Sequence, residues 1–252
     1  LKEEKIDGFV ISHGTSTLEE TAYFLHLTIP TEKPIVLVGA QRPFTALSSD
    51  AHINLIQAVR VACSDESFGK GVLVVLNDEI NCAREVTKGS TYRLHTFHSN
   101  SHGNLGIIDT DHSVQFYRKP IRKHTIRSEF SHLAIEKLPG VEIIYSYAGA
   151  SGFLIDAIVK SGKFQGIVVA GTGAGLVSPS ELESLQRAIE KGLYVVRSSR
   201  VGNGRVVPIK LYESCSFISS DDLLPQKARI LLMLSLLKYE NYEDIQKVFA
   251  TH

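Results

Sequence analysis

Residues 10–20 read Val-Ile-Ser-His-Gly-Thr-Ser-Thr-Leu-Glu-Glu, and this stretch decides the fold class. An apolar strand is expected to end at Ser12, and a glycine turn carrying two hydroxyl side chains, Thr15 and Ser16, leads into a helix. Open α/β sheets bind ligands at such a junction, because backbone N–H groups and the helix dipole there favour negative charge. A threonine hydroxyl at this point can attack a carbonyl carbon if a base lies beside it.

The same hydroxyl residues also fit a purely structural role. Thr17 with Glu20, and Ser16 with Glu19, each match the capping-box pattern, in which a hydroxyl and a glutamate satisfy free N–H groups at the start of a helix. Capping boxes are common, so the motif alone favours a helix cap over a catalytic site. The rest of the chain has to decide between the two interpretations.

Composition and charge exclude several classes of protein. The 252 residues suffice for one large or two modest domains. Hydrophobic residues make up 43% and charged residues 21%, which is ordinary for a globular protein, and the formal net charge of zero gives no indication of a nucleic-acid or membrane partner. No stretch approaches the roughly 20 apolar residues of a membrane span. The basic run 118–127 is interpreted as a solvated linker.

The cysteines bear on the compartment. Three cysteines, Cys63, Cys82 and Cys215, are too few and odd in number for a disulfide framework, and they favour a reducing environment. A cytoplasmic location is therefore expected, with a periplasmic one left open. Cys63 continues an apolar helix pattern and is expected in the core, and Cys82 lies near the motifs below without a positioned base.

Strand and helix signals alternate along the chain, and the rhythm restarts after residue 139. Short apolar runs without polar alternation are typical of buried parallel strands. The βαβαβ rhythm in both halves predicts two α/β domains, a larger one over 1–118 and a smaller one with a parallel sheet over 140–252, joined by 119–139. The expected strands are 9–12, 34–39, 71–76, 141–148, 166–170 and 193–197, with short strands inside 105–117. The expected helices are 18–27, 51–62, 152–161, 179–191, 224–237 and 242–249.

Ordered blocks of sequence resemble the bacterial-type L-asparaginase/glutaminase family almost end to end. They include His13-Gly14-Thr15, Gly39-Ala40-Gln41-Arg42-Pro43, Cys82-Ala83-Arg84-Glu85-Val86-Thr87-Lys88-Gly89-Ser90-Thr91, Val196-Arg197-Ser198-Ser199-Arg200 and Pro225-Gln226-Lys227-Ala228-Arg229. So many blocks at matching spacing make the resemblance specific. It implies a two-domain α/β fold and an amidohydrolase that releases ammonia from L-asparagine or a related amide, without metal or organic cofactor.

The resemblance also implies roles for particular residues. Thr15 and Lys88 would belong to a Thr–Lys–Asp catalytic set, with Thr15 as nucleophile or water activator and Lys88 as its base. A lysine acts as a base only where burial or nearby positive charge lowers its pKa. Both residues follow or end neighbouring strands, so their Oγ and Nζ atoms are expected within about 3–4 Å. The implied substrate contacts are Ser16, Gly14, Ala40 and Gln41.

The chain departs from the family pattern at two acidic positions. Family enzymes that act on asparagine carry an aspartate where Ser16 stands, and serine cannot supply the charge that holds a substrate ammonium group. A second carboxylate, given by a partner subunit, is expected near Ile209, whereas the nearest acidic residue is Glu213. A lactam, an N-acylated amino acid or another amide therefore remains open as the substrate.

Family members carry a further segment before the His-Gly-Thr block, with a first catalytic threonine. That segment does not precede Leu1 in the sequence, so the chain is expected to be truncated at its N-terminus. A non-catalytic ligand-binding homologue is the alternative from another functional class.

Two other motifs are assigned no chemistry. Gly171-Thr172-Gly173-Ala174-Gly175 has the spacing G-x-G-x-G, not that of a dinucleotide-binding loop. His95, His98 and His102 lie among serine, asparagine and glycine residues, so solvated loop histidines are favoured over metal ligands.

The resemblance implies a homotetramer built as a dimer of dimers, with Gly171–Gly175 and the 201–213 loop facing the partner.

Overall fold

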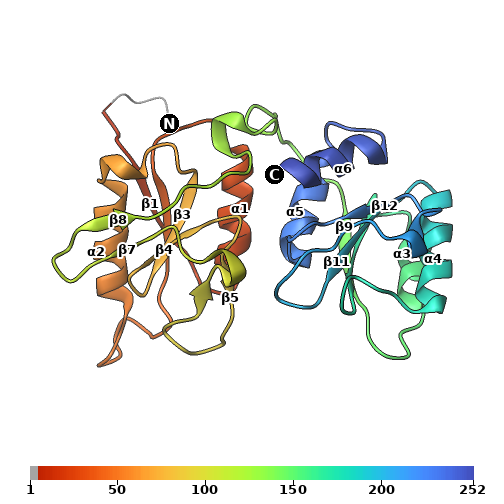
Figure 1. Cartoon of the computed structure of the whole chain (residues 1–252), viewed down its shortest axis with the longest axis horizontal. Coiled ribbons are helices and arrows are strands. Elements are labelled where there is room, and N and C mark those ends of the chain that lie inside the picture. The colour runs from red at the N-terminus through yellow and green to blue at the C-terminus, as the bar shows by residue number, and fades with distance from the viewer. Residues whose placement is uncertain (1–4) are drawn as a thin grey trace. The chain divides into compact units, whose positions relative to one another are not determined.

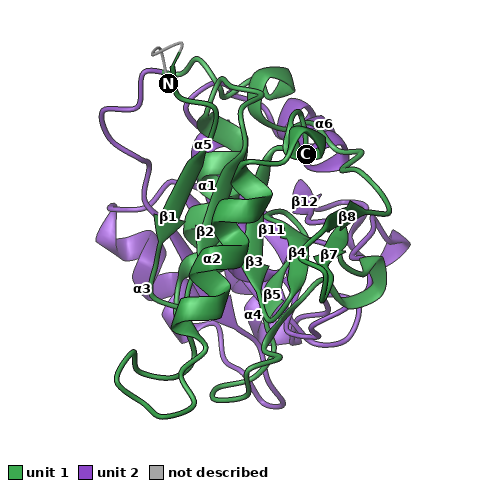
Figure 2. Ribbon diagram, turned by 90° about the vertical axis from the view of Figure 1, so that its left-hand side faces the viewer, with its two compact units in different colours: residues 1–133 green, residues 134–252 purple. Residues whose placement is uncertain are grey.

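The computed structural model describes residues 5–252 and divides the chain into two compact units, 1–133 and 134–252. Figure 2 colours the two units separately. Each unit has its own sheet covered by helices, so the prediction of two α/β domains is confirmed. The boundary between the units falls inside the 119–139 segment.

The first unit is built on a six-stranded sheet in the order β1-β2-β3-β4-β7-β8. Its strands are β1 (Phe9–Ser12), β2 (Ile35–Val38), β3 (Val72–Leu76), β4 (Glu79–Cys82), β7 (Gly106–Ile108) and β8 (Val114–Phe116). Strands β1, β2 and β3 pair in parallel, as predicted. The sheet then continues antiparallel through β4, β7 and β8.

Helices α1 (Leu18–Thr28) and α2 (Ala51–Ala62) cover opposite faces of this sheet (Figure 1). Successive side chains of a strand point to opposite faces, and β2 shows this directly. Val36 and Val38 enter a buried cluster with α2, whereas Ile35 and Leu37 enter one with α1. A strand that is buried on both faces has an unbroken apolar sequence, and for this reason β2 was predicted correctly from the sequence.

Two expectations for this unit are wrong. Cys63 is exposed, because it is the C-cap residue that follows α2, whose last two residues, Val61 and Ala62, are still buried against the sheet. The basic run 118–127 is not a solvated linker throughout. Arg118 donates to the Glu85 carboxylate at 2.6 Å, and His124 and Thr125 are buried. A short 3-10 helix, Thr125–Arg127, packs on α1.

A two-stranded ribbon lies outside the main sheet of the first unit. It consists of β5 (Thr87–Lys88) and β6 (Phe97–His98), which pair antiparallel. The other 3-10 helices among residues 5–252 are Asp65–Ser67, Asn100–His102 and Lys210–Tyr212.

No helix in the part of the chain described is long and apolar enough to span a membrane.

The second unit has a four-stranded, wholly parallel sheet in the order β12-β11-β10-β9. Its strands are β9 (Val141–Tyr145), β10 (Gly166–Gly171), β11 (Tyr194–Ser199) and β12 (Phe217–Ser219). Its helices are α3 (Phe153–Ser161), α4 (Pro179–Glu190), α5 (Pro225–Ser235) and α6 (Tyr242–Thr251). All but the short β12 were predicted within a few residues.

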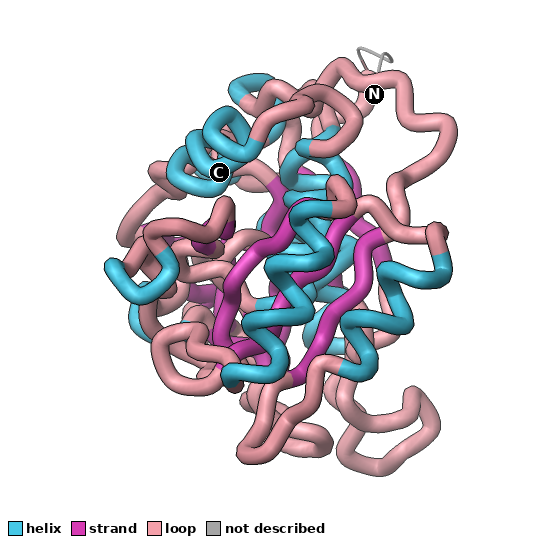
Figure 3. The backbone as a smooth tube through the Cα atoms, turned by 90° about the vertical axis from the view of Figure 1, so that its right-hand side faces the viewer, coloured by secondary structure: helices cyan, strands magenta, loops and turns pink. Residues whose placement is uncertain are grey.

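Helices α3 and α4 lie side by side against one face of this sheet, and Figure 3 looks onto them. Ile155 of α3 and Leu185 of α4 join Ile167 and Val195 of the strands in one apolar cluster. Helix α4 begins with a complete capping box, because Ser178 accepts from the backbone N–H of Glu181 and the Glu181 carboxylate accepts from that of Ser178.

Candidate active site

Thr15 and Lys88 meet at the carboxyl end of the first sheet. Thr15 lies in the turn between β1 and α1, and Lys88 ends β5. Lys88 Nζ is 2.8 Å from Thr15 Oγ1, and both side chains are half-buried. The predicted contact is confirmed. A hydroxyl and an amine at this distance can exchange a proton, which is the first requirement for a nucleophile and its base.

Gly39 follows β2 and lies against this pair. A Cβ atom at this position would be 2.8 Å from the His13 carbonyl oxygen and 3.1 Å from Thr15 Cγ2. Any side chain here would therefore displace the backbone before Thr15 or Thr15 itself. The absence of a Cβ at Gly39 lets two strand ends approach closely enough to hold the hydroxyl beside Lys88.

His13 anchors the turn that carries Thr15. Its backbone N–H donates to the Val38 carbonyl at 2.8 Å, and its ring Nδ1 lies 2.7 Å from the Gly14 carbonyl. A carbonyl only accepts, so Nδ1–H donates to it, and Nε2 forms a hydrogen bond with the Thr21 hydroxyl at 2.9 Å. The imidazole thus joins the turn to α1 and is fully engaged in doing so.

The predicted capping box at the start of α1 is absent. Thr17 is the N-cap residue, but its side chain makes no capping hydrogen bond, and its φ and ψ of −127° and 14° differ from the extended backbone typical of that position. The purely structural interpretation of this motif, as a hydroxyl cap, therefore fails.

A cavity of about 350 Å³ opens between the ends of β1 and β2. Gly14 and Ala40, two of the expected substrate contacts, line it, whereas Thr15, Lys88, Gln41 and the exposed Ser16 do not. The side-chain amide of Gln41 donates to the carbonyls of Thr91 and Arg93 at 3.2 and 3.1 Å. The other lining residues are Ser12, His13, Val38, Gly39, Phe44, Ala51 and Leu55.

The other motifs singled out in the sequence lie away from the Thr15–Lys88 pair or stabilise the local backbone. Cys82 is buried with its sulfur 4.0 Å from His26 Nε2. His95 lies 3.2 Å from the Glu79 carboxylate, and no cluster of three or more His, Cys, Asp or Glu side chains suited to a metal occurs among residues 5–252. The 171–175 turn is closed by hydrogen bonds between Thr172 and Leu176.

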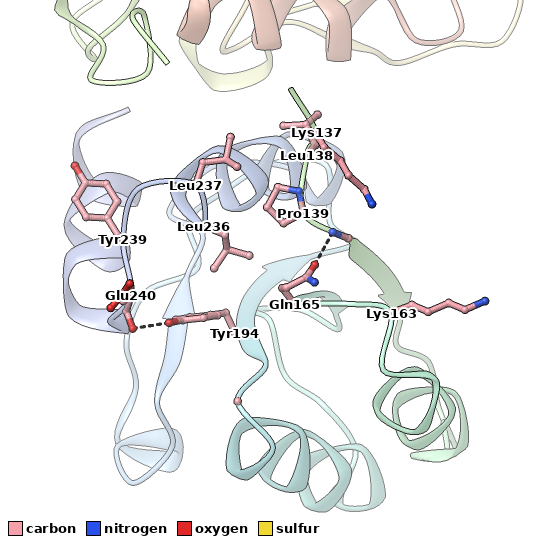
Figure 4. Close-up of a pocket in the computed structure, with 12 residues that line it drawn as sticks. Lys137, Leu138, Pro139, Lys163, Gln165, Tyr194, Leu236, Leu237, Tyr239 and Glu240 are labelled. Carbon is pink, nitrogen blue, oxygen red and sulfur yellow. Dashed lines mark hydrogen bonds between the residues drawn. The ribbon is translucent and has the colours of Figure 1, made fainter. Parts of the chain in front are cut away.

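The second unit has a hollow of about 520 Å³ at the amino-terminal ends of its strands (Figure 4). Its polar groups bond to one another. The Gly140 N–H donates to Gln165 Oε1 at 2.7 Å, and the Tyr194 hydroxyl donates to the Glu240 carbonyl at 2.5 Å. Parallel α/β sheets place ligands at the opposite, carboxyl ends of their strands, so this hollow is assigned no chemistry.

Comparison with known proteins places the chain in a family. Residues 1–122 match the family model "Asparaginase, N-terminal", and residues 140–249 match "Glutaminase/Asparaginase C-terminal domain". The chain belongs to the asparaginase family.

Several curated relatives are similar over nearly the whole chain. L-asparaginase 2 of Bacillus subtilis is 47% identical over 99% of the chain and 66% of its own length. The probable periplasmic L-asparaginase of Haemophilus influenzae is 46% identical over 96% of the chain and 70% of its own length. The glutaminase-asparaginase of Pseudomonas fluorescens is 43% identical, with coverages of 97% and 67%. The chain thus spans about two thirds of the length of these relatives.

Proposed function

We propose that the protein is an asparaginase-like amidohydrolase that converts the side-chain amide of L-asparagine, or a related amide, to the acid and ammonia. The observation that carries this proposal is the 2.8 Å contact between Lys88 Nζ and Thr15 Oγ1. The family and the names of the relatives support it, and they do not favour a lactamase or a non-catalytic binding protein.

Thr15 is the nucleophile and Lys88 is its base. The Lys88 amine accepts the hydroxyl proton as Thr15 Oγ1 attacks the amide carbon. The resulting ammonium returns that proton to the departing nitrogen, so ammonia leaves and an ester joins Thr15 to the acyl group. Water then attacks the ester carbon while Lys88 takes its proton, which releases the acid and restores the Thr15 hydroxyl.

The substrate is held by Gly14, Ser16, Ala40 and Gln41. Gly14 directly precedes Thr15, and Ala40 directly follows Gly39, which lies against Thr15, so their position beside the nucleophile supports their assignment. The side-chain N–H groups of Gln41 donate to two carbonyls and its backbone N–H donates to Asp50, so this residue contacts the substrate through an oxygen atom. Ser16 offers a hydroxyl but no charge, and a hydroxyl attracts an ammonium group more weakly than a carboxylate does.

The test is ammonia release from a panel of amides by the folded protein, with a Thr15→Val variant as the blank. L-asparagine, L-glutamine and an N-acetylated asparagine separate the side-chain amide reaction from a preference for a blocked amino group. The proposal predicts ammonia above the blank from at least one of them. Folded protein that releases none from the whole panel contradicts it.

The active assembly is a homotetramer formed as a dimer of dimers. Exposed apolar side chains on the two loops expected to face a partner support this, namely Leu176, Val201 and Val207, which are 39%, 47% and 40% exposed. Light scattering should give the mass of four chains at micromolar concentration, and a monomer mass contradicts the assembly. The three free cysteines support a cytoplasmic location.

A further inference from the structure

Asp50 stands at the N-cap of α2 but does not cap that helix. An aspartate there ordinarily accepts a hydrogen bond from the second or third backbone N–H of the helix. Instead, its Oδ2 accepts from the backbone N–H of Gln41 at 3.0 Å, and its Oδ1 accepts from that of Arg42 at 2.9 Å. Asp50 is only 9% exposed. Its carboxylate thus binds the loop that precedes α2 instead of the first N–H groups of the helix.

Asn54, one turn along α2, extends the same arrangement. Its side-chain N–H groups donate to Asp50 Oδ2 and to the Gly39 carbonyl, both at 3.0 Å, and its Oδ1 accepts from the Asn77 N–H at 3.1 Å. Gly39 follows β2 and Asn77 follows β3. The first turn of α2 therefore joins the carboxyl ends of two neighbouring strands to Asp50.

Gln41 connects this hydrogen-bonded group to the ribbon that contains Lys88. Its side-chain amide donates to the carbonyls of Thr91 and Arg93, which lie in the loop between β5 and β6. Residues 39–42, called here the anchored loop, are thus fixed on one side by Asp50 and on the other by the loop that follows Lys88.

We propose that Asp50 is a positioning residue for the site. It orients the anchored loop for substrate and, through Gln41, stabilises the position of the ribbon that contains Lys88. The inference rests on the proposed function, in which the backbone at Ala40 contacts the substrate. A neutral amide cannot replace the carboxylate. Asp50→Asn would turn an NH₂ group toward one of the two backbone N–H donors and leave that donor unpaired.

The test compares Asp50→Asn with a matched variant, Asn241→Ala. Asn241 is the N-cap of α6 in the second unit, and its Oδ1 accepts from the Asp244 N–H at 2.9 Å, so its loss removes an ordinary cap. KM and kcat for L-asparagine are measured together with hydrogen exchange of the Gln41 and Arg42 amides.

Asp50→Asn is expected to raise KM by about tenfold or more and to lower kcat by less, because the anchored loop binds substrate directly, whereas Lys88 is affected only through Gln41. The Gln41 and Arg42 amides should exchange about tenfold faster or more, with β2 and β3 still protected. Asn241→Ala should leave both readouts at wild-type values. If Asp50→Asn does not fold, Asp50→Glu keeps the charge, displaces it by one methylene, and should shift both readouts in the same direction.

An unchanged KM together with wild-type protection of the two amides overturns the inference, even if stability falls. A wild-type protein that releases no ammonia from any amide of the panel overturns the proposed function on that result alone. Amide exchange then decides the role of Asp50 separately: faster exchange in the variant supports it, and unchanged exchange refutes it.

Discussion

His124 should make the first unit sensitive to acid. Its imidazole is 2% exposed and lies against that of His26, with ring centroids 4.8 Å apart. An arginine can only donate, so His124 Nε2 accepts from Arg127 at 3.0 Å and Nδ1–H donates to the Thr125 hydroxyl at 2.9 Å. This bonding requires the neutral ring. Burial first, and the Arg127 charge second, lower the pKa of His124 from 6.5 to about 4.

The sign and size of the effect follow from that pKa. The folded value lies below the unfolded one, so the unfolded chain binds more protons between the two, and stability falls as pH drops from 6.5 toward 4. A shift of this size corresponds to roughly 3 kcal/mol once pH is below both values. Between pH 7 and pH 4.5 the expected loss from His124 is about 2 kcal/mol.

His124→Gln isolates this contribution. A glutamine can accept from Arg127 and donate to Thr125 but does not titrate, so it keeps both bonds at every pH. Urea unfolding at pH 7 and pH 4.5 should show the wild type losing about 2 kcal/mol more than the variant between the two pH values. Equal losses in the two proteins would refute the assignment of a neutral, buried His124.

Three substitutions test other parts of the account. Gly39→Ala places a Cβ 3.1 Å from Thr15 Cγ2 and should lower kcat by about 10²-fold through misplacement of the hydroxyl; steady-state kinetics with wild-type kcat would contradict this. Ser16→Asp should lower KM for L-asparagine by about tenfold, because a carboxylate attracts the ammonium group; an unchanged or higher KM argues against contact at this position. Ser178→Ala removes the α4 capping box and a 2.7 Å bond to the Ala150 carbonyl, and should lower the free energy of unfolding by about 1–2 kcal/mol; an unchanged urea midpoint would show that the cap contributes nothing.

The sequence predicted those parts of the fold that depend on periodic burial. The apolar runs at β2, β3 and β10 are buried on both faces, so their pattern identifies them without further information. Strands β4, β5, β6 and β12 were not predicted, because strands of two to four residues that include polar side chains carry no clear period.

The site was predicted less completely than the sheets. Thr15 and Lys88 were placed together correctly, since strand ends converge at one edge of a parallel sheet. The cap at Thr17 failed because the backbone there takes another conformation. The bonds of Asp50 to Gln41 and Arg42 lie in an irregular loop, and the contact of His26 with His124 joins residues distant in sequence, so no periodic pattern encodes either of them.

The most direct test of the central claim is a double-mutant cycle on the Thr15–Lys88 pair, with ammonia release from L-asparagine as the readout. Thr15→Val and Lys88→Met should each lower kcat by about 10²–10⁴-fold while the proteins stay folded. The double variant should be no slower than the slower single variant, because a nucleophile and its base act as one unit. Near-wild-type turnover by either single variant, or losses that multiply in the double variant, would contradict the account.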